Sequence, residues 1–112
     1  NMENKDVVLA LAALAQETRL AIFRALVQAG PAGMSAGDIA RHLDVAPSLL
    51  TFHLKELIHA RLIRQERAGR SLISSANFDV MNGVLAYLTE NCCGGNPCTP
   101  AGKEVCAEPG KS

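Results

Sequence analysis

The four cysteines of this 112-residue chain all lie between residues 92 and 112, in a segment rich in glycine and proline. They are Cys92, Cys93, Cys98 and Cys106. Thiolates are soft ligands that select soft metal ions, so this cluster predicts soft-metal or redox chemistry. Zinc usually takes four ligands, with its cysteines in pairs separated by two to four residues. The adjacent pair Cys92-Cys93 is atypical of such a site.

Disulfide formation is the alternative use of these thiols. Neighbouring Cα atoms lie about 3.8 Å apart, below the usual ~4.4–6.8 Å span of a disulfide, so a Cys92–Cys93 bridge would be strained. A bridge from Cys98 to either of them is feasible, and a thiol redox sensor therefore stays open. Gly94-Gly95 is expected to end the preceding helix and to let both sulfurs bend inward. Asn96-Pro97 predicts a turn that returns Cys98 toward the pair.

The chain as a whole has the composition of one globular domain, with 48% hydrophobic residues and a net charge of zero. It has no apolar run of eighteen residues and no secretory signal, so we expect a cytoplasmic protein with reduced thiols. The charge is unevenly distributed along the sequence. Residues 41–70 contain six basic and three acidic side chains, and all three histidines lie there. By itself such a bias is typical of a solvated face.

Apolar periodicity predicts helices over most of the first sixty residues. Residues 5–14 form an apolar, alanine-rich segment that we expect to be buried, with another subunit as the candidate partner. The next helix begins at Glu17 or Thr18 and ends at Gly30-Pro31. A loop and a short helix follow, with Ser35 as N-cap, and Pro47 suits the first position of the helix after that.

The helix that opens at Pro47 has two distinct faces. Leu50, Leu54 and Leu57 form one apolar stripe, and Ser48, Thr51 and Lys55 fall on the opposite side. Two helices joined by so short a turn, the second with small polar side chains at its start, match the helix-turn-helix pattern.

Two strand-like runs, residues 62–66 and 71–75, then surround Ala68-Gly69 and predict a β-hairpin. A final helix follows, with Asn77 as N-cap and the cysteine pair at its end. The fold class is therefore mainly α with a β-hairpin wing, a winged helix-turn-helix. Its domain occupies residues 1–91, and an irregular cysteine-rich tail occupies residues 92–112.

This order of elements predicts a DNA-binding surface. Ser48 and Thr51 are short enough to approach base edges, and we expect Lys55, Arg67 and Arg70 to contact phosphate. For His53, a phosphate contact competes with a packing role that orients the helix, and its position beside the apolar stripe favours packing.

An enzyme is not expected from these residues. Ser48, His53 and Glu56 spread over the faces of one short helix, and nothing in the sequence suggests an oxyanion pocket.

The segments "LAALAQETRLAIFRALVQAG" and "SAGDIARHLDVAPSLLTFHLKELIHARLIRQERAGRSLISSA", with the helix that follows, resemble the ArsR/SmtB family of winged-helix metalloregulators over residues 7–93. The resemblance implies a homodimer joined through its first and last helices. It also implies a repressor that binds double-stranded DNA at an inverted repeat and is released by a metal or metalloid.

Members of this family differ in where they place their ligands. The helix after Pro47 has no cysteine and residues 77–91 have no histidine, so two of the known sites look absent. The motif "ENCCGG…C" is similar to that of a subgroup that senses trivalent arsenic or antimony. This similarity implies Cys92, Cys93 and Cys98 as ligands of As(III) or Sb(III), with Cys106 possible in place of Cys98. A thiol redox repressor, or a sensor of zinc or cadmium, is the alternative on the same fold.

Overall fold

The computed structural model of the chain describes residues 2–95. Within these residues no helix combines the length and the apolar composition needed to cross a bilayer. The helices are α1 (Asn4–Leu14), α2 (Glu17–Ala29), α3 (Ala36–Leu43), α4 (Pro47–His59) and α5 (Phe78–Leu88), with short 3₁₀ turns η1 (Gly30–Ala32) and η2 (Cys92–Gly95). The strands are β1 (Met34–Ser35), β2 (Ile63–Ala68) and β3 (Ser71–Ala76).

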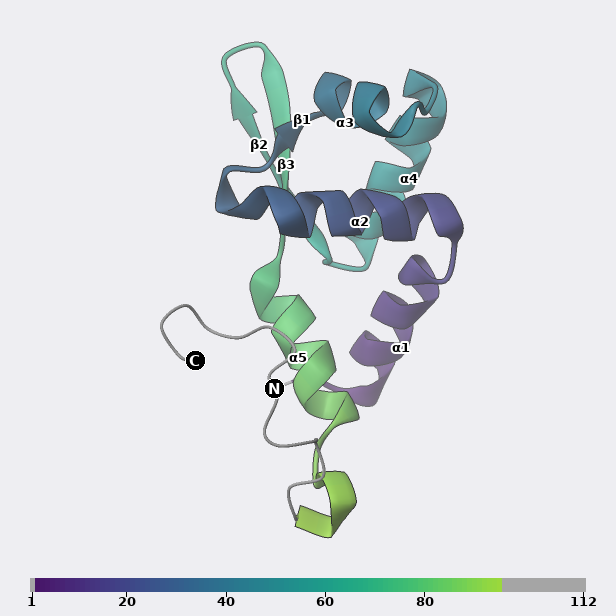
Figure 1. Ribbon diagram of the computed structural model, residues 1–112, viewed down its shortest axis with the longest axis vertical. Helices are drawn as coiled ribbons and strands as arrows, with labels where there is room; N and C mark the ends of the chain where they lie inside the picture. Colours follow the sequence, from purple (N-terminus) through teal and green to yellow (C-terminus); the bar gives the residue numbers. More distant parts are fainter. Residues whose placement is uncertain (1, 96–112) are drawn as a thin grey trace.

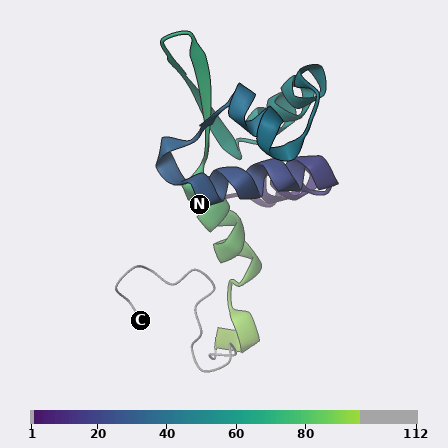
Figure 2. The ribbon, with the colours of Figure 1, turned by 45° about the horizontal axis from the view of Figure 1, so that its top comes forward.

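The molecule has two ends, separated by α2 (Figure 1). The α3–α4 pair and the β2–β3 hairpin lie on one side of α2, and α1 and α5 lie on the other side. Figure 2 shows the same division, with the hairpin projecting beside α3 and α4 and with η2 at the opposite end. This is the expected winged helix-turn-helix, mainly α with a hairpin wing. The side chains that were predicted to contact DNA are therefore far from the cysteine pair.

The core beneath α3 and α4 is formed by the apolar stripes that the sequence predicted. Ile22 and Leu26 of α2, Ile39 of α3 and Leu57 of α4 are each fully buried. Burying a side chain of this size contributes about 1.5–3 kcal/mol, so these four residues account for a large share of the packing that holds the helices together. The N-cap at Ser35 is confirmed, since its hydroxyl accepts a hydrogen bond from the Asp38 N–H at 3.1 Å.

The sheet differs from the prediction in two details. Its order is β1-β3-β2, all antiparallel, and β1 was expected to be part of a loop. Ala68 pairs with Ser71, so the hairpin turn is Gly69-Arg70 and not Ala68-Gly69. Gly69 has a φ of 65°, which suits the first central position of a two-residue hairpin loop.

The prediction that the last helix continues to the cysteine pair was wrong, because α5 ends at Leu88. The Thr89 hydroxyl donates a hydrogen bond to the Leu85 carbonyl at 2.8 Å, and Asn91 enters the left-handed region with a φ of 55°. Residues 89–95 are all exposed, so no packing supports a further helical turn there. The Asn77 N-cap at the other end is confirmed, with its side chain accepting from the Val80 N–H.

We predict that Gly33→Ala destabilises the fold more than Gly30→Ala does. Both glycines combine a positive φ, 71° and 79°, with a ψ of −167°, a backbone region that only glycine adopts readily and that costs an alanine about 1–3 kcal/mol. At Gly33 a Cβ would also lie 2.2 Å from the Ser74 carbonyl oxygen, whereas at Gly30 it would meet nothing within 4 Å. Urea unfolding at one fixed protein concentration should show the loss at Gly33 to be at least twice that at Gly30. Equal losses would mean that the contact between Gly33 and β3 is not tight in solution.

Candidate nucleic-acid interface and thiol site

The start of α4 is presented outward by a tight connection from α3. Asp44 takes a left-handed conformation with a φ of 55°, and the Val45 N–H donates to the Ala40 carbonyl at 3.0 Å. The N-cap residue is Ala46, and Pro47 takes the first helical position, as predicted. Alanine has no side-chain acceptor, so the cap residue does not cover the N–H groups of the first turn. A helix end of this kind suits an anionic partner.

The three predicted contact residues of α4 lie on its outer face. Ser48, Thr51 and Lys55 are all exposed, opposite the buried Leu50 and Leu54. The Thr51 hydroxyl donates to the Pro47 carbonyl at 3.0 Å, so its hydrogen is used within the helix. The Thr51 oxygen can still accept a hydrogen bond. Of the two hydroxyl groups on this face, the one that can donate a hydrogen bond to DNA is that of Ser48.

Two apolar residues share this face and were missed by the sequence analysis. Leu49 is 49% exposed and Phe52 is 52% exposed. The signal was present in the sequence, because at 100° per residue Phe52 falls about 40° from Ser48, on the side away from the leucine stripe. The outer face of α4 is thus partly apolar.

His53 is buried, and the structure supports a packing role for it. It is 5% exposed, and its Nδ1 atom lies 3.2 Å from an NH1 donor of Arg19. A guanidinium can only donate, so Nδ1 accepts and the imidazole is neutral. Burial lowers the pKa of His53 below its ordinary value of 6.5, the Arg19 charge lowers the pKa further, and Glu56 opposes both. His53 is therefore placed to orient α4 and not to reach a phosphate.

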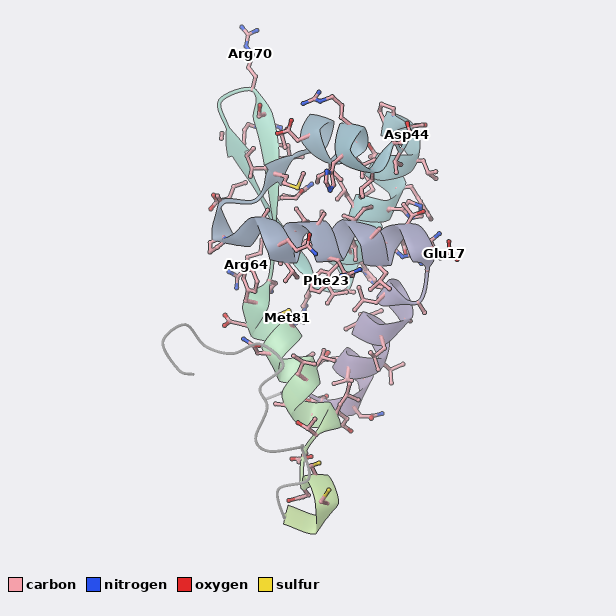
Figure 3. The ribbon with its side chains drawn as sticks, in the orientation of Figure 1. Glu17, Phe23, Asp44, Arg64, Arg70 and Met81 are labelled. Carbon is pink, nitrogen blue, oxygen red and sulfur yellow. The ribbon has the colours of Figure 1, made fainter. Side chains whose placement is uncertain are left out.

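The hairpin carries the two predicted wing arginines. Arg67 and Arg70 are both exposed, and Figure 3 shows Arg70 extending from the tip, away from the body of the protein. Two other basic residues of the same region have acidic partners: Arg41 pairs with Asp38, and Arg64 lies 3.5 Å from Asp79.

The cysteine pair lies beyond the end of α5. Cys92 and Cys93 are exposed in η2, and Cys93 has a φ of 55°. This left-handed residue brings the two Sγ atoms to 3.8 Å, although adjacent residues in a regular helix would point about 100° apart. The 3.8 Å separation is too long for a disulfide bond between these two sulfurs. The other predicted ligands, Cys98 and Cys106, lie outside the described residues.

Among residues 2–95, nowhere do three His, Cys, Asp or Glu side chains gather closely enough to hold a metal ion. His42 and His59 are exposed on α3 and α4. Asp79 on α5 is engaged with Arg64.

An apolar groove of about 680 Å³ lies where α1, α2 and α5 meet. Figure 3 shows Phe23 of α2 and Met81 of α5 on facing elements there. Leucines at its margin are strongly exposed, including Leu85 at 45% and Leu88 at 57%. A solvent-facing apolar surface of this kind marks a protein–protein contact more often than a free surface.

The chain has relatives among characterised regulators. Residues 14–66 match a protein family described as a helix-turn-helix domain. An arsenical resistance operon repressor of Bacillus subtilis (strain 168) is 36% identical over 81 residues, which span 72% of this chain and 73% of that protein.

Solved structures show the same fold. An ArsR-like transcriptional regulator from Rhodococcus sp. RHA1 superposes with a TM-score of 0.68 at 27% identity, covering 81% of this chain and 82% of that one. A homodimeric winged helix-turn-helix DNA-binding domain from Mycobacterium bovis gives a TM-score of 0.64, covering 86% and 89% of the two chains. At 18% identity the second match shows a shared fold alone.

We predict that the stability of the protein falls in acid partly through His53. Its folded-state pKa is lowered below 6.5, so the unfolded chain binds the proton more readily, and stability is lost as the pH falls from about 6.5 through the folded-state pKa. Urea unfolding of wild type between pH 8 and about pH 5 should show this loss, and His53→Gln should reduce it. The matched control is His59→Gln on the exposed side of the same helix, which leaves the Arg19 contact intact and should keep the wild-type fall. If the free energy of unfolding fell with pH equally in wild type and in His53→Gln, His53 would not be a cause of the loss of stability in acid.

Proposed function

The chain belongs to the ArsR family of winged-helix transcriptional repressors, and from that premise we propose that it is an inducible, metalloid-responsive repressor. As a homodimer it binds an inverted repeat in double-stranded operator DNA. It leaves the DNA when As(III) or Sb(III) binds Cys92, Cys93 and Cys98. The observation that carries the proposal is the convergence of two thiols just beyond α5, the helix whose exposed leucines form the candidate dimer surface.

The DNA-binding part of the proposal is supported by the outer face of α4. Its helix start has an alanine cap, and Ser48 and Lys55 are exposed near it. A helix that enters the major groove this way directs its first-turn side chains at base edges. Arg67 and Arg70 on the wing then contact phosphates beside the groove and set the register.

The homodimer is supported by the apolar surface of α1 and α5. We assign a second copy of the chain to the groove between α1, α2 and α5, because Leu11, Leu85 and Leu88 at its margin are exposed in the single chain. The homodimeric state of the Mycobacterium bovis domain is consistent with this assignment. A twofold dimer places two copies of α4 one turn of DNA apart, as an inverted repeat requires.

The sensing part is supported by ligand chemistry. As(III) and Sb(III) are soft, thiophilic ions, and three thiolates neutralise their charge. The two sulfurs lie 3.8 Å apart, close enough for one soft ion to contact both. Cys98 completes the set, and Cys106 is the alternative third ligand. The thiols must be reduced to act as ligands.

Release follows from the position of the site. Ligation draws Cys92 and Cys93 onto one ion and moves the end of α5, and with it the partner subunit packed on that helix. This changes the relative orientation of the two α4 helices. A coupling free energy of about 1–3 kcal/mol between the two sites would weaken DNA binding about 5–150-fold.

Thiol redox sensing on the same fold is the second candidate function, and the exposure of Cys92 and Cys93, with their sulfurs 3.8 Å apart, favours it. In that case oxidation replaces metalloid binding as the event that releases DNA. Zinc or cadmium sensing is a weaker candidate, because an adjacent cysteine pair is atypical of zinc.

We predict that replacing Cys92, Cys93 and Cys98 by serine leaves operator binding within about twofold of wild type and abolishes release by arsenite. Cys92 and Cys93 lie in the exposed η2, far from α4, and Cys98 lies outside the described residues. The measurement is fluorescence anisotropy of a labelled operator duplex, titrated with arsenite, antimonite, zinc and cadmium under reducing conditions.

The control for this experiment is Cys106→Ser, which should still be released if Cys98 is the third ligand. Release of the triple variant by arsenite would disprove the metalloid site. Release of wild type by an oxidant, with no response to any ion under reducing conditions, would establish the redox alternative.

We predict that Leu88→Glu converts the dimer to a monomer and weakens operator binding at least 100-fold. A charge placed at this 57% exposed position would be buried without a partner in the interface, but it costs the single chain little. Sedimentation velocity gives the oligomeric state. Ile58→Glu, at a 37% exposed position on α4, is the matched control and should remain dimeric. A dimeric Leu88→Glu protein would place the interface elsewhere.

A further inference from the structure

Near the start of α4, the outer face exposes two large apolar side chains and few side-chain hydrogen-bond donors. Leu49 and Phe52 are about half exposed, whereas Thr51 uses its hydroxyl hydrogen on the Pro47 carbonyl. Residues three apart on a helix are neighbours, so Leu49 and Phe52 form one continuous patch beside Ser48. A face built to read bases by hydrogen bonds alone would not expose a phenyl ring at its centre.

Phe52 is also held in place from beneath. Its ring meets the ring of His53 edge to face, with centroids 5.3 Å apart and planes at 61°. His53 is itself buried and hydrogen-bonded to Arg19. An exposed aromatic side chain that rests on a fixed, buried neighbour loses less conformational entropy on binding than a mobile one.

We propose that Phe52, with Leu49 beside it, reads thymine in the operator by contact with the C5-methyl group. This inference rests on the proposed DNA-binding function. In the major groove the four base pairs present hydrogen-bonding groups and one apolar group, the thymine methyl. An apolar patch on the helix that enters this groove therefore discriminates thymine from the other bases.

A second copy of the chain is not the partner of this patch. The apolar surface assigned to the dimer lies on α1, α2 and α5, and neither Leu49 nor Phe52 lines its groove. In Figure 1, α4 lies across α2 from α5. The neighbours of Phe52 on the outer face are instead Ser48 and Lys55, the side chains suited to DNA.

The test uses duplexes selected from a random pool by the wild-type protein under reducing conditions, with each thymine of a half-site then replaced by deoxyuridine. Deoxyuridine lacks only the methyl group. We expect one or two replacements to weaken wild-type binding by about fourfold each, the factor expected for burial of one methyl. The Phe52→Ala variant should bind the thymine and the deoxyuridine duplexes with equal affinity, because it has lost the side chain that contacts the methyl group.

Two control variants separate this contact from general effects. Arg70→Ala should weaken binding to thymine and deoxyuridine duplexes equally, because a phosphate contact carries no base information. Ile58→Ala, an apolar truncation at the exposed C-terminal end of the same helix, should change neither.

Three outcomes would overturn the inference. They are a wild-type protein indifferent to deoxyuridine at every position, a Phe52→Ala variant that keeps the fourfold discrimination, and a Phe52→Ala variant that loses the dimer. If the wild-type protein selected no duplex at all, the proposed function would fail together with it, and that result is distinct from the other three.

Discussion

Arg19 is the constraint on which the placement of the DNA-reading helix depends. Its Nε donates to the Ala13 carbonyl at 2.7 Å, its NH1 lies 3.2 Å from His53 Nδ1, and its backbone N–H donates to the Gln16 side chain at 2.8 Å. A part-buried cation is costly without partners, so α1, α2 and α4 cannot shift independently. The orientation of α4 is therefore tied to α2 and to α1, a helix of the proposed dimer surface.

Asn77 supplies the corresponding link between the hairpin and α5. Its backbone N–H donates to the Leu62 carbonyl at 2.8 Å, its amide donates to the Arg61 carbonyl at 3.0 Å, and its side-chain oxygen caps the helix. The ion pair between Arg64 and Asp79 lies beside it. The base of the hairpin thus sets the direction of α5. A movement of α5 would therefore also move the hairpin, and the reverse.

The sequence was informative where structure is decided locally. Ser35, Pro47 and Asn77 were assigned correctly because a cap depends on residues one turn away. The strand β1 was missed because two residues become a strand only by pairing with β3. The role of His53 stayed open for the same reason, since its partner Arg19 is 34 residues away. Cys98 as a ligand remains a prediction.

The placement of the thiols outside the core has an energetic reason. Val84 is the fully buried residue of α5, and from Leu85 to the end of the helix every residue is exposed, with the Tyr87 hydroxyl donating to Asn4 at 2.8 Å. An inducer that binds Cys92 and Cys93 reaches them without opening the core. On the proposed function, its binding energy then acts on the exposed C-terminal end of α5. A coupling of about 1–3 kcal/mol suffices for release, and this is small beside the ~5–15 kcal/mol that stabilises a domain. The repressor can therefore leave its operator while remaining folded.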